Sequence, residues 1–307
     1  MPGSAAMTMA PFSEAAVTTA ILSEVQGVMG LKRHPRLFRV VSLPLRPAAR
    51  RLARLLVELE RQVSENGWQA GAKSFLAHFV RDTRLSGADE LPRRGALLVV
   101  SNHPAAYDVI LLAAALPRDD LKIISSPIAV IPCLPAIASH FIFISDEAHG
   151  RMATVRAALR HLETGGALLL FPRGDAEPDP AITPGALESI KSWSASLDLF
   201  LRKAPQTRTV VSIVSGVLSP RWMHNPLVRL WKRPEQRQKV AEMFQVAQQL
   251  LRSQTHTPNP QVRFSKPITT AELRHKVSAP DGYRRGIAAQ ARAMLTEMAA
   301  SDPSLLL

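Results

Sequence analysis

The sequence has very little cysteine. Cys133 is the one cysteine among 307 residues, which excludes an intrachain disulfide and a zinc site built from several cysteines. This composition fits a reducing compartment. We do not expect thiol catalysis either, because a lone cysteine usually packs as a small apolar side chain.

Long apolar runs are also missing. The longest unbroken run covers residues 109–116, less than half of the about 20 residues that a membrane-spanning helix needs. Residues 123–144 contain no charged residue, but three prolines interrupt them and disfavour a spanning helix. The first residues lack the basic start and apolar core of a secretory signal. We therefore expect a cytoplasmic protein that meets a membrane from one side.

Aromatic residues and acidic charge are both scarce. Aromatic residues make up 5% of the chain, and 38 Lys and Arg outnumber 25 Asp and Glu, giving a net charge of +13. The excess of positive charge indicates an anionic partner. With few stacking aromatics and no zinc-finger spacing or RNA-recognition block, we expect no nucleic acid. A phosphate-bearing substrate and an anionic membrane surface remain.

The segment from Leu31 to Arg54 carries the most one-sided charge, with eight basic residues and no acidic one. One interpretation is a solvated helix surface. The other is attraction to anionic lipid headgroups, worth about 1 kcal/mol for each basic residue near the surface. The sequence leaves both open. The basic residues are Lys32, Arg33, Arg36, Arg39, Arg46, Arg50, Arg51 and Arg54.

Hydrophobic periodicity divides the chain near residue 88. Residues 1–87 have helical patterns at 13–27, 47–65 and 68–83, so we predict a helical, basic, membrane-associating region. From residue 88 to 307, apolar runs alternate with helical stretches, which predicts an α/β domain with a mixed, largely parallel sheet flanked by helices. The predicted strands are 96–101, 122–125, 141–144, 167–171, 209–214 and 261–264, and the helices 105–115, 147–163, 184–201, 235–252 and 283–299.

Two polar segments follow predicted strands. Strand 96–101 leads into Asn102-His103-Pro104, with Asp108 at the start of an apolar helix. A His held by a nearby carboxylate can accept a proton from a substrate hydroxyl, although the aspartate alone could equally cap the helix. Strand 167–171 leads into residues 172–180, which are also polar. Ligands of open α/β sheets bind at this edge, so the two segments together predict a site.

Three short sequence blocks of this chain resemble blocks of the 1-acylglycerol-3-phosphate and glycerolipid acyltransferase family. Asn102-His103-Pro104 with Asp108, then Phe171-Pro172-Arg173-Gly174, then Val210-Val211-Ser212-Ile213-Val214 stand in that family's order. The resemblance covers roughly residues 90–270 and ends in Val262-Arg263-Phe264-Ser265-Lys266-Pro267-Ile268.

The resemblance implies direct O-acyl transfer. His103, oriented by Asp108, would deprotonate an acceptor hydroxyl that attacks an acyl thioester of coenzyme A or acyl carrier protein. The acceptor would be a lysophospholipid or related lipid-like alcohol, in phospholipid biosynthesis at the inner face of the cell membrane. No metal or redox cofactor is implied. Backbone N–H groups near the turn at 171–174 are candidates to stabilise the oxyanion.

Two positions depart from the family's pattern, and they concern acceptor binding. The third block usually has Glu where this chain has Arg173, and the second block usually ends in an Arg where this chain has Ser145, the nearest arginine being Arg151. Arg173 could bind phosphate itself, with Glu177 in a polar role. The residues that we predict to bind substrate are Asn102, Arg151, Arg173, Gly174 and Glu177.

The sequence is also compatible with two other functions. The altered second and third blocks are compatible with a non-catalytic lipid or phosphate binder on the same fold. A thioester hydrolase would use the same His103 with water in place of the alcohol.

Overall fold

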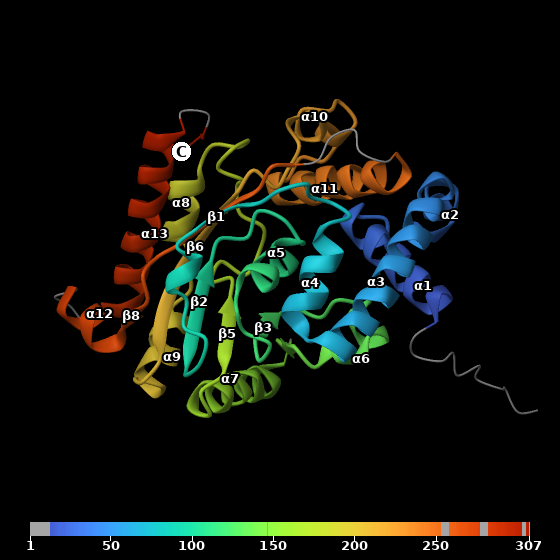
Figure 1. The fold of residues 1–307 in the computed structure, drawn as a ribbon. Helices are drawn as coiled ribbons and strands as arrows, with labels where there is room; N and C mark the ends of the chain where they lie inside the picture. The colour runs from blue at the N-terminus through green and yellow to red at the C-terminus, as the bar shows by residue number, and fades with distance from the viewer. Residues whose placement is uncertain (1–12, 146, 253–257, 277–281, 303–304, 307) are drawn as a thin grey trace, which may run out of the picture.

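The computed structural model describes residues 13–145, 147–252, 258–276, 282–302 and 305–306. Its centre is an eight-stranded sheet with the order β1-β7-β6-β2-β5-β3-β4, and β8 pairs with β6 (Figure 1). The strands are β1 (Arg84–Ser86), β2 (Leu97–Ser101), β3 (Lys122–Ser125), β4 (Phe141–Phe143), β5 (Ala167–Leu170), β6 (Arg208–Ser215), β7 (Gln261–Phe264) and β8 (Ile268–Thr269).

Most of the sheet is parallel. Strand β2 pairs in parallel with β5 and β6, while β3 pairs in parallel with β5 and β4. Strands β7 and β8 run antiparallel to β6. Every residue of β2 and β5 is buried, as expected for parallel strands covered on both faces. The predicted fold class, a mixed and largely parallel sheet flanked by helices, is confirmed.

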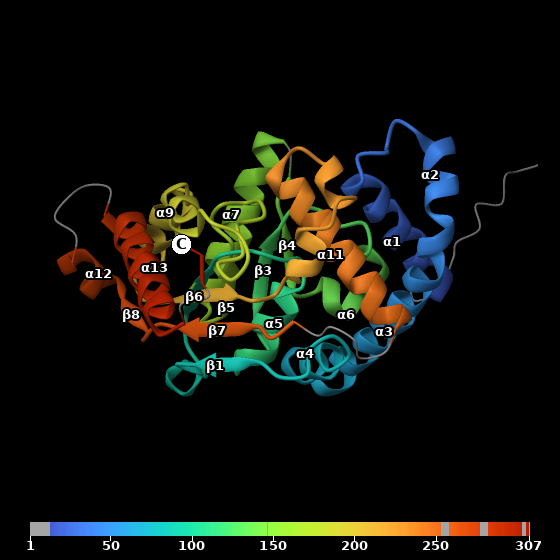
Figure 2. The ribbon, with the colours of Figure 1, turned by 90° about the horizontal axis from the view of Figure 1, so that it is seen from above.

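Helices cover both faces of the sheet (Figures 1 and 2). Alternate residues of β2 point to opposite faces, so Leu97 and Val99 join one buried core and Leu98 and Val100 the other. The first core packs against α1 (Glu14–Val28), α3 (Arg46–Asn66), α4 (Trp68–Leu76), α5 (Asp108–Ala115), α6 (Pro135–Ala138), α10 (Pro220–Met223) and α11 (Pro234–Leu251). The second packs against α7 (Ala148–Glu163), α8 (Ala186–Lys191), α9 (Ser196–Lys203), α12 (Thr270–Lys276) and α13 (Gly282–Ser301).

Several predicted elements differ from the structure. The predicted helix 68–83 ends at Leu76. Strand β1 lies in the region predicted as purely helical; its three residues are exposed, so no apolar run marks it. The predicted helix 184–201 is two helices, because the Ser194 N–H bonds Pro172 O and the Trp193 indole turns inward between them. Helix α5 begins at Asp108, later than predicted. A short helix, α2 (Pro35–Val41), lies in the basic segment.

Among the described residues, none of the helices is both long enough and apolar enough to cross a bilayer.

Candidate active site

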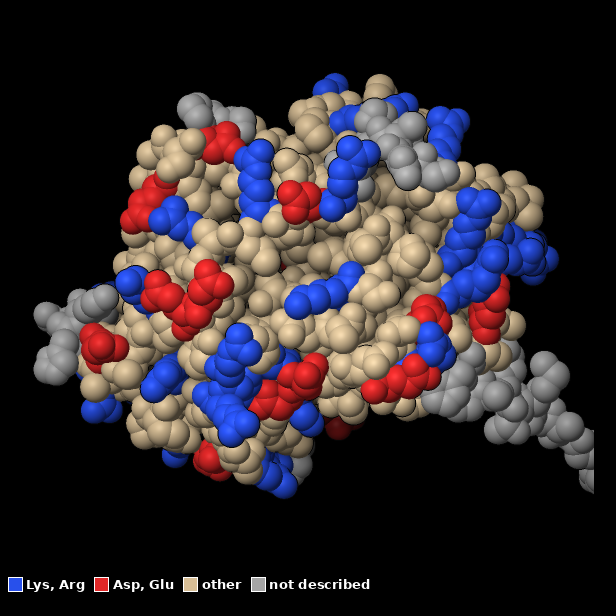
Figure 3. Space-filling model, viewed as in Figure 1, with Lys and Arg blue, Asp and Glu red and all other residues tan. Residues whose placement is uncertain are grey.

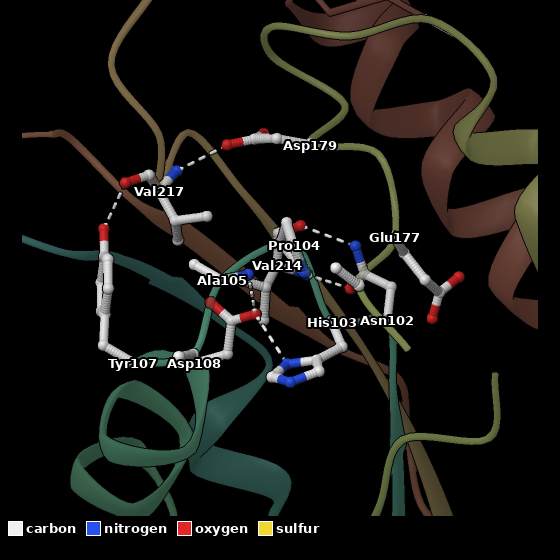
Figure 4. Close-up of polar contacts among 12 residues, drawn as sticks. Asn102, His103, Pro104, Ala105, Tyr107, Asp108, Glu177, Asp179, Val214 and Val217 are labelled. Carbon is white, nitrogen blue, oxygen red and sulfur yellow. Dashed lines mark hydrogen bonds and ion pairs between the residues drawn. The ribbon is translucent and has the colours of Figure 1, made fainter. Parts of the chain in front are cut away.

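The carboxyl end of β2 brings His103 and Asp108 together (Figure 4). Asp108 opens helix α5, and its Oδ2 lies 3.3 Å from His103 Nδ1 and accepts the Ala105 N–H at 2.7 Å. The aspartate side chain is fully buried, whereas the imidazole is 25% exposed. Asp108 therefore holds Nδ1 of the His103 ring, and Nε2 remains available to a ligand.

Phe171 holds the imidazole from the neighbouring strand end. The two rings stack with their centroids 4.1 Å apart and 24° between their planes. Nε2 of His103 has no hydrogen bond to any residue that the structure describes, and the ring lines a cavity. With the Nδ1 proton facing Asp108, Nε2 becomes a hydrogen-bond acceptor open to the cavity.

Burial determines the protonation of the pair. It lowers the pKa of His103, since a charged imidazolium is poorly solvated there. Burial also raises the pKa of Asp108 well above its usual range, against the hydrogen bond from Ala105. Asp108 Oδ1 has no hydrogen-bond partner among the described residues. Because its pKa is lowered, the imidazole of His103 is neutral at neutral pH, and the neutral imidazole is the form that a general base requires.

Asn102 supports the strand end rather than the cavity. Its side-chain amide donates to Val214 O at 2.8 Å and accepts the Val214 N–H at 2.7 Å. Both polar atoms are thus used in tying β2 to β6. Asn102 is buried and does not line the cavity at His103, so the structure does not place it for the predicted substrate contact.

The segment after β5 is mostly engaged with protein. Arg173 pairs with Glu235 at 3.0 Å and donates to Ser189 Oγ at 3.3 Å. Gly174 adopts a φ of 77° and donates its N–H to Phe171 O. That N–H, one of the predicted oxyanion donors, is therefore already used. Neither Arg173 nor Gly174 lines the cavity at His103.

Glu177 is a buried structural group. It is 1% exposed, accepts from Ser189 Oγ at 2.6 Å and from the Trp193 indole at 3.1 Å, and burial raises its pKa. Its backbone N–H donates to His103 O at 2.8 Å. Glu177 does not line the cavity at His103, and its backbone bond to His103 joins the two polar segments.

Arg151 lies away from the imidazole. It is an exposed residue in α7, beyond β4 at the edge of the sheet, and does not line the cavity. None of the five predicted substrate-binding residues therefore lines the cavity at His103.

Asp179 is a structural residue that we did not single out from the sequence. It is fully buried, and its carboxylate accepts four backbone N–H groups at 2.8–3.0 Å, three of them from the loop after β6. Figure 4 shows the bond from the Val217 N–H. The three partners in the loop after β6 lie 37–39 residues away in sequence, so no local pattern predicts these contacts.

A cavity of about 360 Å³ opens from His103 between the N-terminal helices and α11. Its wall is apolar apart from a few charged groups, which suits a hydrocarbon chain. The lining comes from α1 (Ile21, Glu24, Val25, Val28), from α3 and the residue before it (Leu45, Ala48, Ala49, Leu52, Leu56), from α11 (Lys239, Glu242, Met243, Val246, Ala247, Leu250), and from His103, Pro104, Ala105, Ala106, Val130 and Ala176.

A second, more polar hollow adjoins this cavity. It has a volume of about 540 Å³ and shares Glu24, Val28 and Lys239 with the first. The exposed Lys32 and Arg233 also line it, and within the described residues their side chains form no ion pair. No group of three or more His, Cys, Asp or Glu in the same part of the chain is placed to hold a metal ion.

Comparison with known proteins found one family profile that matches part of the chain. Residues 82–216, which hold both polar segments, match the family profile described as Acyltransferase. Among solved structures, the chain is similar to the 1-acyl-sn-glycerophosphate (LPA) acyltransferase PlsC from Thermotoga maritima. The identity is 16%, the TM-score is 0.46, and the match covers 95% of this chain and 100% of that one. No curated protein matches the sequence.

Proposed function

We propose that this chain, whose residues 82–216 match the Acyltransferase family profile, transfers a fatty acyl group from a thioester to a lysophospholipid or related lipid-like alcohol. The observation that carries the proposal is an imidazole held by Asp108 at the mouth of an apolar cavity. The thioester of acyl-coenzyme A or acyl carrier protein is the donor, and no metal or redox cofactor takes part.

His103 acts as the general base. Nε2 takes the proton of the acceptor hydroxyl while its oxygen bonds to the thioester carbonyl carbon. The tetrahedral intermediate then collapses, the carbon–sulfur bond breaks, and the imidazolium returns its proton to the departing thiolate. Asp108 holds the ring through Nδ1, and the imidazolium that forms beside it favours the ionised form of its buried carboxyl, so the two charges compensate each other at a poorly solvated site.

The acyl chain occupies the cavity between α1, α3 and α11. Each buried CH₂ group contributes about 0.8 kcal/mol to binding, so this wall favours long chains over short ones. The acceptor's phosphate lies in the adjoining polar hollow, near Lys32 and Arg233, whose side chains form no ion pair among the described residues. This replaces the predicted phosphate contact of Arg173, whose guanidinium is already paired with Glu235.

The protein meets an anionic membrane, at the inner face of the cell membrane, through its N-terminal helices. Helix α2 and the turn after it expose Leu37, Val40 and Leu43 by 53%, 64% and 54%, beside arginines of the basic segment. Figure 3 shows a group of Lys and Arg side chains at the edge of the molecule over the N-terminal helices. Apolar side chains that enter the headgroup layer, flanked by basic ones, are typical of peripheral binding.

Vesicle sedimentation tests the membrane contact. Arg36→Glu with Arg39→Glu should release the protein from phosphatidylglycerol vesicles, with little binding to phosphatidylcholine vesicles in any variant. Arg93→Glu with Arg94→Glu makes the same charge change at exposed positions of the segment before β2 and should keep binding. Equal loss in both pairs would mean that net charge, and not α2, drives the association.

Thiol release tests the reaction. The purified protein is given acyl-coenzyme A or acyl carrier protein thioesters, with and without a panel of lysophospholipids. Acceptor-dependent release that is lost in His103→Ala supports transfer. Release without an acceptor favours a hydrolase, and no release from either donor favours a non-catalytic lipid binder.

A further inference from the structure

Helix α11 presents a buried polar stripe to the candidate active site. Gln238, Glu242 and Gln245 lie at i, i+4 and i+7, on one side of the helix, and are 4%, 8% and 1% exposed. Buried polar side chains are costly unless they are bonded. This helix lies outside residues 82–216, so the family match assigns no role to the stripe.

The two glutamines bond the loops on either side of His103. Gln238 Nε2 donates to Pro104 O and to Glu177 O, which connects the segments after β2 and β5. Gln245 accepts the Ser219 N–H at 2.7 Å and donates to Val217 O at 3.0 Å, in the loop after β6. One helix face thus contacts the loops that follow three adjacent strands, β5, β2 and β6.

Glu242 contacts the turn between His103 and Asp108 itself. Its Oε2 accepts the Ala106 N–H at 3.0 Å, and its Oε1 accepts the Tyr107 N–H at 3.3 Å. The carboxylate also lines the cavity. A group bonded to two consecutive N–H donors fixes the path of the backbone at that point, and the path of this turn sets how His103 meets Asp108.

We propose that Glu242 is a positioning residue for acyl transfer, whose carboxylate holds the 105–107 turn so that Asp108 orients His103. The inference rests on the proposed function. The ionised carboxylate of Glu242 accepts both N–H groups, because neither oxygen carries a proton. In the protonated carboxyl, one oxygen carries a proton that faces one of the two N–H groups and weakens that hydrogen bond.

The surroundings of Glu242 make this contact sensitive to pH. Burial raises the pKa of Glu242 to about 7, with the Ala106 hydrogen bond acting against it and the charge of Asp108 adding to it. The titratable groups that face it are His103, Tyr107 and Asp108 on the catalytic segment, Glu24 on α1 and Lys239 on its own helix, while α3 contributes apolar residues. Protonation of Glu242 as the pH falls below about 7 should therefore loosen the turn.

The test compares wild type with Glu242→Gln by acceptor-dependent thiol release from acyl-coenzyme A across pH. We expect kcat to fall on the order of 10-fold at alkaline pH, with KM for the thioester changed less than about twofold. In wild type, the decrease of kcat toward acid pH should contain an ionisation near 7 in addition to that of His103. The ionisation near 7 should be absent from Glu242→Gln.

Glu60 provides a matched control. It is a buried carboxylate on α3 that also accepts two consecutive N–H groups, from Ala136 at 2.6 Å and Ile137 at 3.0 Å, and it does not line the cavity. Glu60→Gln should change thermal stability by a similar amount and leave kcat and the pH profile as in wild type.

The outcomes separate the two proposals. A wild-type protein without acceptor-dependent release contradicts the proposed function. An active wild type with equal effects of Glu242→Gln and Glu60→Gln on kcat contradicts the positioning role. If Glu242→Gln does not fold, the wild-type profile decides, because an acid limb with a single ionisation well below 7 overturns the inference.

Discussion

The two polar segments at the carboxyl edge of the sheet look alike in sequence but differ in what their side chains face. After β2, His103 turns its free nitrogen toward an apolar cavity. After β5, Arg173, Glu177 and Asp179 turn to protein partners, and Glu177 and Asp179 are almost completely buried. In the proposed function, the first segment carries the chemistry, whereas the second holds neighbouring loops in place.

This difference shows that polar residues at a strand end do not by themselves indicate ligand contact. A buried polar group must be bonded, and protein partners meet that need as well as substrate does. The variants below test whether the division between a chemical and a structural segment holds.

Replacing the proposed base should have the largest effect. His103→Gln removes the nitrogen that takes the proton, so kcat/KM for acyl transfer should fall about 10²–10⁴-fold. His140→Gln is the control, since that imidazole stacks on Trp68 and bonds Leu121 O away from the cavity. Steady-state thiol release measures both. Equal activity of His103→Gln and wild type would show that His103 is not the general base of the reaction.

Replacing Asp179 should lower stability. Asp179→Asn places an amide N–H₂ against backbone N–H donors, so the free energy of unfolding should fall by about 2–3 kcal/mol. Asp175→Asn breaks an exposed pair with Lys239 and should change it by less than about 1 kcal/mol. Urea denaturation followed by circular dichroism gives both values. Similar losses in the two variants would mean that the backbone contacts of Asp179 contribute little.

Filling the cavity should change chain-length preference. Ala49 is a buried residue of α3 in the cavity wall, and Ala49→Leu takes space from the acyl chain. We expect kcat/KM for a hexadecanoyl donor to fall on the order of 10-fold relative to a dodecanoyl donor. An unchanged ratio would place the acyl chain elsewhere.

Removing Arg173 should have the smallest effect on acceptor binding. Its guanidinium is paired with Glu235, so Arg173→Ala should raise KM for a lysophosphatidic acid acceptor less than about threefold. Lys32→Ala with Arg233→Ala should raise that KM more than Arg173→Ala does, with no change for a monoacylglycerol acceptor. A larger increase in KM for Arg173→Ala than for the double variant would mean that the segment after β5 binds the phosphate.

The sequence predicted the sheet well because buried parallel strands are short, continuous apolar runs, such as Leu97–Ser101 and Ala167–Leu170. It also predicted that His103 and Asp108 would meet, since five positions and one helix start separate them. It did not predict the partners of Asn102, Asp179 and Glu242. Those contacts join residues 112, 37–39 and 135–136 positions apart, and packing of whole elements, rather than a local pattern, brings them together.

The most direct test measures activity and unfolding free energy together for His103→Gln and Asp179→Asn. We predict opposite results for the two variants. His103→Gln loses acceptor-dependent thiol release and keeps wild-type stability. Asp179→Asn loses stability and, at a temperature where it remains folded, keeps most of its activity. A folded Asp179→Asn protein as inactive as His103→Gln would contradict the division between the two segments.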